Sequence, residues 1–235
     1  MVTEILKPYL EEHGALLSEK QLSQLESYAR LLTEWNEKMN LTAIVDEEGI
    51  ALKHFLDSLA LLRHAEIPNG ARVADVGTGA GFPGMPLRIL KDDFDLTLLD
   101  SLGKRVNWLQ EVCDELQLKR VACVHARAEE FAMQHREQFD IATSRAVAQL
   151  SILSELCLPL VKVGGQFAAM KSVDTEDEIA AAKSAIKTLG GHIVKVEDYT
   201  IPTSDVVHRL VIVEKVSPTP RAYPRAFAKI KKAPL

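Results

Sequence analysis

The segment DVGTGAGFPG, residues 75–84, has three glycines at alternate positions and directly follows a β-rich run at residues 72–76. Because glycine lacks a Cβ, Gly77, Gly79 and Gly81 let the backbone turn tightly and approach a ligand closely. A plain turn between a strand and a helix needs only one such residue. The segment therefore predicts a ligand-binding loop at the carboxyl end of the first strand of an α/β sheet.

Residues 66–216 alternate between short β-rich runs and amphipathic stretches, which indicates right-handed crossovers and a mostly parallel sheet. The connection around Pro202 leaves no room for a helix, so we expect the last two strands to form an antiparallel hairpin. Helices are expected over residues 104–116, 149–160 and 176–189. Strands are expected at residues 72–76, 95–99, 121–125, 139–143, 166–170, 192–199 and 207–214.

The N-terminal part of the chain is expected to be helical. Ser18 and Gln21 match a capping box, and apolar residues then recur at spacings of three and four, as on one buried face of a helix. A second helical stretch is expected over residues 47–64, and the sequence Pro68-Asn69-Gly70 breaks the pattern. These changes predict a helical extension at residues 1–65, an α/β domain at 66–216 and a basic tail at 217–235.

The composition is that of an ordinary globular protein, with 235 residues, 47% of them hydrophobic, and a formal charge of −5. It excludes collagen-like, low-complexity and wholly disordered chains. No run of about 18 apolar residues occurs, so no membrane span is expected. The three cysteines are scattered and form no C-x-x-C pair, so neither a disulfide framework nor a metal site is expected. Reduced thiols suit a cytoplasmic protein.

Charge is distributed unevenly along the chain. Residues 221–235 contain five basic side chains and no acid, and because they contribute +5 to a net charge of −5, the rest of the chain carries −10. Such a tail is either a phosphate-binding arm or a solvated chain end. The basic side chains, candidate contacts to a nucleic acid, are Arg221, Arg225, Lys229, Lys231 and Lys232.

Two classes of cofactor could use the glycine loop, and the first is a dinucleotide. Residues 79–84 match the G-x-G-x-x-G fingerprint, and Asp100 lies 21 positions after Gly79, where a ribose-binding acid belongs. The match begins three residues after the strand ends, however, and Pro83 and Pro86 suit poorly a helix start that must offer N–H groups to a pyrophosphate. An NAD(P)-dependent oxidoreductase is therefore one alternative.

The second candidate cofactor is S-adenosylmethionine, which has no phosphate. It needs a glycine loop under its amino-acid portion, an acid for its ribose hydroxyls and a contact near its adenine. Asp75, the glycine loop and Asp100 supply the first two. After the third strand, the backbone of Ala128 and the carboxylate of Glu129 could contact adenine, although this segment could equally be a helix start with acids at its positive end.

The residues after the fourth strand, Ser144–Ala148, limit the chemistry of a methyl transfer. They include no Asn/Asp-Pro-Pro-aromatic turn for an exocyclic amine, no cysteine nucleophile for pyrimidine C5 and no carboxylate base. Guanine N7 has a free lone pair and needs only alignment with the methyl donor, so no catalytic acid or base is assigned. Arg145 could hold the cofactor carboxylate, stack on a base or form a surface ion pair.

Several motifs follow one another along most of the chain. They are WNEKMNLT at 35–42, HFLDS at 54–58, residues 75–87, LDSLGKR at 99–105, RAEE at 127–130, SRAVA at 144–148 and YPR at 223–225. In this order they resemble the RsmG (GidB) family of small-subunit rRNA guanine-N7 methyltransferases. The resemblance implies a class I S-adenosylmethionine-dependent methyltransferase fold, Rossmann-like with a seven-stranded sheet, behind an N-terminal helical extension.

The resemblance also implies an activity and its partners. A methyl group would pass from S-adenosylmethionine to N7 of a guanine in the 530 loop of 16S rRNA, within the small ribosomal subunit or an assembly intermediate. We expect a cytoplasmic monomer whose basic tail contacts RNA. An inactive assembly factor with the same fold is a further alternative. The implied cofactor contacts are Gly77, Phe82, Ala128, Glu129 and Arg145, with Asp100 as the ribose acid.

Three motif residues have no clear role in the sequence. Asn40, His54 and Asp57 either line the site or hold the helical extension to the sheet, and we favour the second reading. The chain departs from the family's usual pattern in its tail and after the fifth strand. The departures are Ala226, Phe227, Ala228, Ile230 and Ser172.

Overall fold

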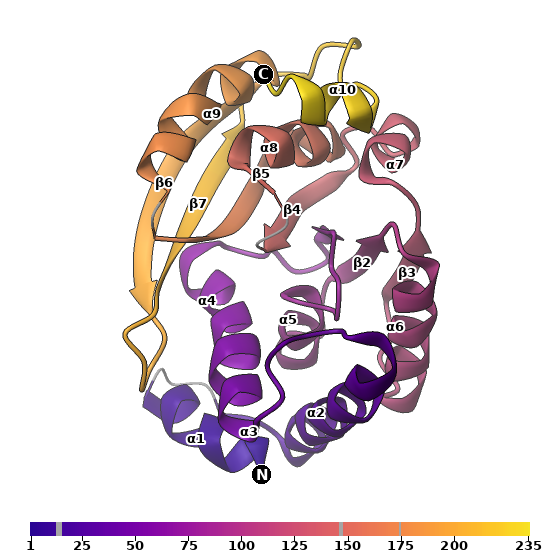
Figure 1. Ribbon diagram of the computed structural model, residues 1–235, viewed down its shortest axis with the longest axis vertical. Helices are drawn as coiled ribbons and strands as arrows, with labels where there is room; N and C mark the ends of the chain where they lie inside the picture. The colour runs from indigo at the N-terminus through magenta and orange to yellow at the C-terminus, as the bar shows by residue number, and fades with distance from the viewer. Residues whose placement is uncertain (13–15, 146–147, 174) are drawn as a thin grey trace.

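One seven-stranded sheet forms the centre of the protein in the computed structural model, which describes residues 1–12, 16–145, 148–173 and 175–235 (Figure 1). The strand order is β3-β2-β1-β4-β5-β7-β6. Strands β1 to β5 are parallel to one another, and β7 is antiparallel to both β5 and β6. The strands are β1 (Arg72–Val76), β2 (Asp95–Asp100), β3 (Val121–His125), β4 (Phe139–Arg145), β5 (Val161–Ser172), β6 (Gly191–Thr200) and β7 (Val207–Lys215).

Helices cover both faces of this sheet (Figure 1). One core lies between the sheet and the helices up to α6, and it includes Tyr28, Phe55 and Trp108. The other core includes Leu150, Phe167 and Ile230. The helices are α1 (Val2–Glu12), α2 (Glu19–Met39), α3 (Glu47–Gly49), the π-helix η1 (Ile50–Leu56), α4 (Asp57–His64), α5 (Gly84–Leu90), α6 (Gly103–Glu115), α7 (Ala128–Gln134), α8 (Leu150–Cys157), the 3₁₀ turn η2 (Leu158–Leu160), α9 (Glu176–Thr188) and α10 (Phe227–Lys232).

The fold class predicted from the sequence is confirmed. The mostly parallel sheet ends in the expected β6–β7 hairpin, and helices precede the first strand. The capping box at α2 is also confirmed, because the Ser18 side chain accepts from the Gln21 N–H while the Gln21 side chain accepts from the Ser18 N–H. The strand order reverses between β1 and β4, and in open α/β sheets such a point is where ligands bind.

Strand β5 begins at Val161, five residues before its expected start at residue 166. Its first part contains Gly164, which has a φ of 85°, and the pairing with β4 is irregular between Phe139 and Ile141. This part is largely exposed and contains two glycines, so it has no apolar alternation from which a strand could be recognised.

Residues 47–64, expected as one helix, form three consecutive segments: α3, the π-helix η1 and α4. The π-helical turns include His54, and Asp57 follows them at the first position of α4. π-Helical segments are rare and frequently lie at functional sites. Both residues are buried, and both point toward the carboxyl end of β4, as described below.

The N-terminal helices pack on the sheet through one shared core, in which Leu25 and Phe55 belong to the same cluster as Leu98. The division at residue 65 therefore marks a change in element type, and the three-part division of the chain stays a prediction. Among the described residues, no helix is both long and apolar enough to cross a membrane.

Candidate active site

The glycine loop keeps its shape through Asp75, which is fully buried beneath it. Its Oδ2 accepts hydrogen bonds from the Thr78 hydroxyl at 2.7 Å and from the Gly84 N–H at 2.8 Å. Burial raises the pKa of Asp75 to about 6, although these two hydrogen bonds act in the opposite direction. Asp75 therefore holds the loop from inside the protein and does not present its carboxylate to a ligand.

This arrangement disfavours a dinucleotide in the loop. Helix α5 begins at Gly84, whose N–H already donates to Asp75, and Pro83 before it has no N–H. A pyrophosphate would meet a carboxylate at the helix end where it needs free donors. The geometry therefore does not favour the oxidoreductase alternative.

The three loop glycines have different structural roles. All have positive φ angles, of 70° at Gly77, 60° at Gly79 and 93° at Gly81. A Cβ on Gly81 would lie 2.6 Å from the Tyr28 hydroxyl, so this glycine is required for packing against α2. A Cβ on Gly79 would meet nothing closer than 4.0 Å. Gly79 thus faces open space, which is where a ligand of the loop would lie.

Phe82 points toward the N-terminal helices. Its ring stacks on His54 at a centroid distance of 4.5 Å and on Tyr28 at 5.5 Å, and the Tyr28 hydroxyl donates to the Ala80 carbonyl. The side chain is therefore packed in the core and does not line either pocket described below. Only the backbone of Phe82 remains available for the predicted contact with the cofactor, and that contact stays a prediction.

A first pocket, here called the β1–β3 pocket, lies where strands β1, β2 and β3 end. It brings together Gly77, Asp100, Ala128 and Glu129, which are four of the residues predicted to bind the cofactor. The Asp100 carboxylate also accepts the N–H of Gly79 at 3.0 Å, which links the loop to the end of β2. The rest of its lining is Val76, Leu99, Ser101, Ala126, Arg127, Leu153, Leu156 and Phe227.

The chemistry of the β1–β3 pocket fits S-adenosylmethionine. Asp100 and Glu129 are carboxylates that can accept hydrogen bonds from ribose hydroxyls and amines, and Arg127 donates to Glu129 at 2.9 Å. Leu153, Leu156 and Phe227 supply an apolar wall for a flat ring. A phosphate-free, positively charged nucleoside suits this donor and acceptor set, whereas a dinucleotide does not.

A second pocket, here called the β4–β5 pocket, lies on the other side of the switch point. Arg145 projects into it from the end of β4, and its guanidinium carbon lies 4.8 Å above the centre of the Phe82 ring. Ala146 and Val147 of the same motif lie outside the described residues. The pocket is lined by Lys53, His54, Asp57, Arg145, Ala148, Met170, Lys171, Ser172 and His208.

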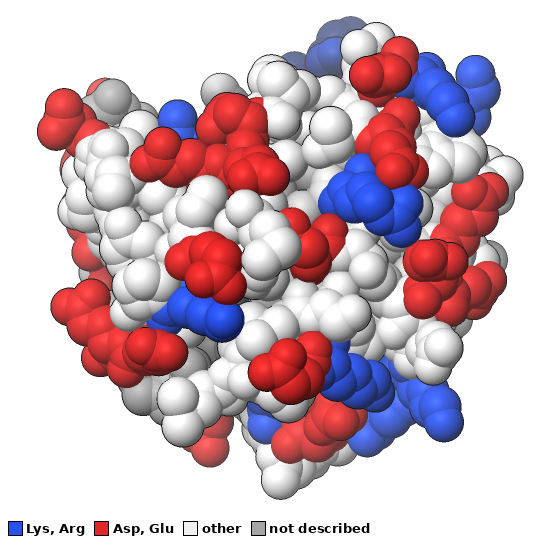
Figure 2. Space-filling view, turned by 90° about the horizontal axis from the view of Figure 1, so that it is seen from below, with Lys and Arg blue, Asp and Glu red and all other residues white. Residues whose placement is uncertain are grey.

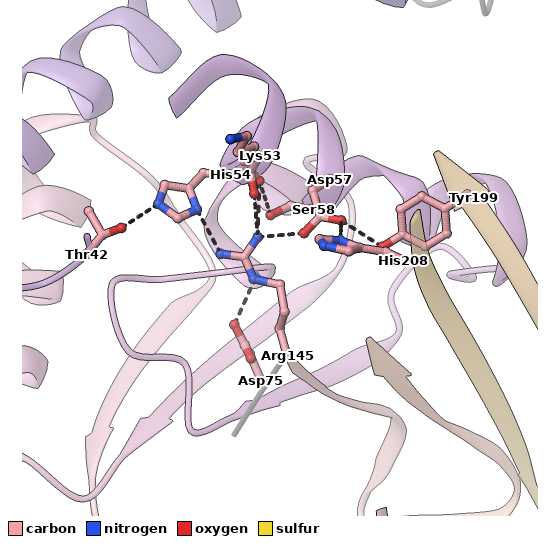
Figure 3. Close-up of polar contacts among 10 residues, drawn as sticks. Thr42, Lys53, His54, Asp57, Ser58, Asp75, Arg145, Tyr199 and His208 are labelled. Atoms are coloured by element: carbon pink, nitrogen blue, oxygen red, sulfur yellow. Dashed lines mark hydrogen bonds and ion pairs between the residues drawn. The ribbon is translucent and has the colours of Figure 1, made fainter. Parts of the chain in front are cut away.

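Asp57 connects the elements around the β4–β5 pocket (Figure 3). Only 1% of it is exposed, yet it accepts three hydrogen bonds, from Arg145 at 2.8 Å, His208 at 2.8 Å and Tyr199 at 2.7 Å. Burial alone would raise the pKa of Asp57, but the bond from His208 and the charge of Arg145 outweigh it, so the pKa lies below its ordinary value. A charged Asp57 thus holds Arg145 in place.

His54 supports Arg145 from the other side (Figure 3). Its Nδ1 lies 3.2 Å from Nη2 of Arg145, and its Nε2 lies 2.8 Å from the Thr42 hydroxyl. Because a guanidinium has only donors, Nδ1 must accept, which places the proton of the neutral ring on Nε2. Burial, followed by the charge of Arg145, lowers the pKa of His54 to about 4.

This low pKa predicts a measurable dependence of stability on pH. The unfolded chain binds a proton at His54 near pH 6.5 and the folded chain only near pH 4, so the unfolded state binds more protons between these values. The free energy of unfolding should therefore fall as the pH drops through this window, by up to roughly 3 kcal/mol from this residue. Urea titrations of the wild type and of His54→Gln should show the extra acid sensitivity in the wild type only. Asp75 titrates in both proteins, so its contribution to the pH dependence cancels in the comparison. Identical pH profiles for the two proteins would contradict the low pKa assigned to His54.

The structure therefore answers the question left open for two of the motif residues. His54 and Asp57 both line the β4–β5 pocket and link the helical extension to the sheet. Asn40 has a left-handed conformation with φ of 48° and caps α2, so it has a structural position at the helix end. Its neighbour Asn36 accepts the Thr42 N–H, which sets the chain direction leading to His54.

Sequence reasoning missed Tyr199 and His208. The two residues are paired across β6 and β7, and both donate to Asp57, which lies more than 140 positions earlier in the chain. Their positions in the sequence relative to the HFLDS motif at 54–58 do not indicate this contact. The predicted hairpin of β6 and β7 is enough to pair Tyr199 with His208. It does not indicate that the pair lies beside α4.

The basic tail is held against the protein. Arg225 pairs with Glu155, which is fully buried, through bonds of 2.8 Å and 2.6 Å, so this side chain anchors the tail. The proposed RNA contacts below therefore leave Arg225 out. The remaining four basic side chains, Arg221, Lys229, Lys231 and Lys232, are exposed.

Comparison with solved structures supports the fold. An S-adenosylmethionine-dependent methyltransferase from Aquifex aeolicus aligns with a TM-score of 0.54 at 17% identity, covering 72% of this chain and 93% of that one. TYW2 from M. jannaschii, solved in complex with AdoMet, aligns with a TM-score of 0.52 at 17% identity, covering 67% of this chain and 75% of that one. At such identities the likeness concerns the fold alone.

Sequence comparison identifies the family. The model for GidB, described as rRNA small subunit methyltransferase G, matches residues 21–207. The ribosomal RNA small subunit methyltransferase G of Clostridium botulinum (strain ATCC 19397 / Type A) is 50% identical over 220 residues, 93% of this chain and 92% of the relative. That of Alkaliphilus metalliredigens is 48% identical over 233 residues, 98% of each chain. The chain therefore belongs to the rRNA small subunit methyltransferase G (GidB) family.

Proposed function

We propose that this protein transfers a methyl group from S-adenosylmethionine to N7 of a guanine in the 530 loop of 16S rRNA. The observation that carries the proposal is the pair of pockets on either side of the β1–β4 switch point. One has the chemistry for a phosphate-free nucleoside, and the other presents the guanidinium of Arg145, a planar cation on which a base can stack. The target base and atom come from the family resemblance.

The β1–β3 pocket would hold the cofactor, which supplies an electrophilic methyl group on a sulfonium. Asp100 accepts from the ribose hydroxyls, and Ala128 and Glu129 contact the adenine. Gly79 leaves room above the loop, and Gly77 lets the backbone approach the ligand. These contacts hold the donor in one orientation, which is the main contribution an enzyme can make to this reaction.

The β4–β5 pocket would hold the guanine. Among the described residues that line it, the one carboxylate is Asp57, which is engaged by three donors. Lys171 donates to the Ala148 carbonyl and pairs with Glu178. His208, whose Nδ1 donates to Asp57, is a further basic group there, but N7 of guanine carries no proton and its methylation needs no base. Arg145, whose guanidinium carbon lies 4.8 Å over the Phe82 ring centre, offers a planar cation on which a base can stack.

RNA should approach the protein from the end that carries the tail. Figure 2 shows the opposite end, formed by the N-terminal helices, where acidic side chains outnumber basic ones. The exposed acids there include Glu4, Glu11, Glu12, Glu34, Glu37, Glu47 and Glu48. Such a surface repels phosphate, so contacts to RNA are local.

Replacing Lys229, Lys231 and Lys232 together with alanine should weaken RNA binding and flatten its salt dependence. Each phosphate neutralised on a single strand contributes about 0.7 to the slope of log K against log salt, so the slope should fall by about 2. Filter binding of a small-subunit rRNA fragment over a salt series measures it. The control changes Lys183 and Lys187, exposed on α9, and should leave the slope unchanged. Equal slopes for both variants would remove the tail from the RNA surface.

We further propose that the protein acts in the cytoplasm, as a monomer, on the small subunit or its assembly intermediate. The free cysteines Cys113, Cys123 and Cys157 are consistent with a reducing compartment. Methyl transfer measured on each assembly state of the small subunit would identify the particle that serves as substrate.

The test of the function uses radiolabelled S-adenosylmethionine, small subunits that lack the native modification, and the extracted RNA. We expect one labelled N7-methylguanine in the 530 loop. Label at another base or atom would refute the target, and cofactor binding without transfer to any particle or RNA would favour the inactive assembly factor. Absence of both binding and transfer would refute the function itself.

A further inference from the structure

We propose that the C-terminal helix α10 completes the cofactor pocket, with Phe227 as the side chain against which the adenine ring of S-adenosylmethionine packs. The inference rests on the proposed function. Phe227 lines the β1–β3 pocket together with Gly77, Asp100 and Ala128, although about a hundred residues or more separate it from each of them. The tail predicted as an RNA arm thus also supplies a wall of the nucleoside site.

The ring of Phe227 is placed to receive a flat ligand. Arg127 lies over one face of the ring, with its guanidinium carbon 5.1 Å from the ring centre, so a base would pack on the rest of the ring. Phe227 is only half-buried, although it packs against the second core. An aromatic ring that is partly uncovered beside a pocket gains contact when a purine base covers it.

The position of Phe227 is set by the anchors of the tail. On its N-terminal side, Arg225 pairs with the buried Glu155, and Arg136 donates to the carbonyls of Tyr223, Thr219 and Pro220. On its C-terminal side, Ile230 is fully buried in the second core. Because both sides are fixed, the ring is held at the pocket before any ligand binds.

Phe227 lies in the part of the β1–β3 pocket where the adenine end of the ligand is placed. Ala128 and Glu129 at the start of α7 lie in the same pocket, as do Leu153 and Leu156 of α8. Together with Phe227 they form a site with apolar walls and few polar groups, which is what a purine requires. Gly79, which faces open space, is not in the lining shared with Phe227, so the amino-acid end of the ligand is assigned to the loop at Gly79 and the adenine end to Phe227.

Calorimetric titration of the full chain with S-adenosylhomocysteine tests the inference. Removing an aromatic side chain from a stacked base weakens binding by about tenfold. We expect Phe227→Ala and Phe227→Leu to bind about tenfold more weakly, and Phe227→Tyr to bind like the wild type. Leucine keeps the apolar packing and lacks the flat ring, so it separates stacking from folding. The matched control is Ala228→Ser, an exposed neighbour on α10, which should bind normally.

Enzyme kinetics provide a second readout. In Phe227→Leu the KM for S-adenosylmethionine should rise about tenfold while kcat stays unchanged, because stacking on adenine is the same in the ground state and the transition state. Wild-type affinity in both Phe227→Leu and Phe227→Ala would overturn the inference and leave the proposed function intact. A wild-type protein that binds no S-adenosylhomocysteine would instead refute the proposed function.

Discussion

Replacing Asp57 with alanine should destabilise the protein by about 3–5 kcal/mol, because it removes the carboxylate at 2.8 Å from the largely buried guanidinium of Arg145. The same change removes the acceptor for His208 and Tyr199. A loss of this size is a large fraction of the stability of an ordinary domain. Urea titration of the purified variant measures it, and methyl transfer should fall with the misplacement of Arg145.

Two further variants separate charge from packing. Asp57→Asn keeps an oxygen for His208 and Tyr199 and loses only the charge, so its destabilisation should be intermediate. In an Arg145→Met background, Asp57→Ala should cost clearly less, because no unpaired cation remains. An equal cost in both backgrounds would contradict the ion pair as the source of the effect. This comparison remains informative even if Asp57→Ala alone fails to fold.

The second large effect is expected at Gly79. Valine there should weaken S-adenosylmethionine binding by at least about a hundredfold, equivalent to nearly 3 kcal/mol. The valine side chain would project into the open space above the loop, and a β-branched residue at a φ of 60° would also shift the loop. Calorimetric titration with S-adenosylmethionine measures the loss.

Gly164→Val is the matched control for Gly79→Val. Gly164 also has a positive φ, of 85°, and a Cβ there would meet nothing within 4 Å, but it lies in the first part of β5, away from both pockets. Both variants should lose about 1–3 kcal/mol of stability through backbone strain. Only Gly79→Val should lose cofactor binding. Equal affinities would mean that the loop does not contact the cofactor.

Much of the fold could be predicted from local sequence. The strands of the sheet and the hairpin were predicted within about two residues, except for the start of β5, because alternating apolar residues mark buried strands. The glycine loop was also predictable, since positive φ angles at Gly77, Gly79 and Gly81 require glycine. The β5 start and the π-helix η1 have no such pattern, so local sequence does not mark them.

Part of the candidate site was also predictable. Gly77, Asp100, Ala128 and Glu129 meet in one pocket because each follows the carboxyl end of a parallel strand, and these ends lie at the same edge of the sheet. The direction of the Phe82 side chain was not predictable. It depends on Tyr28 and His54, which are supplied by helices distant in sequence.

The sequence by itself determined the α/β class, the place of the ligand loop and, by family resemblance, the reaction. These follow from periodicity, from glycine and from motifs that act over a few residues. Only the tertiary structure decided which partners the charged and aromatic side chains would have. Asp57 joins Arg145, Tyr199 and His208, and Arg225 turns from a possible RNA contact into the partner of Glu155. The physical reason is that an ion pair or a ring contact depends on distance in the folded chain, which local sequence patterns do not encode.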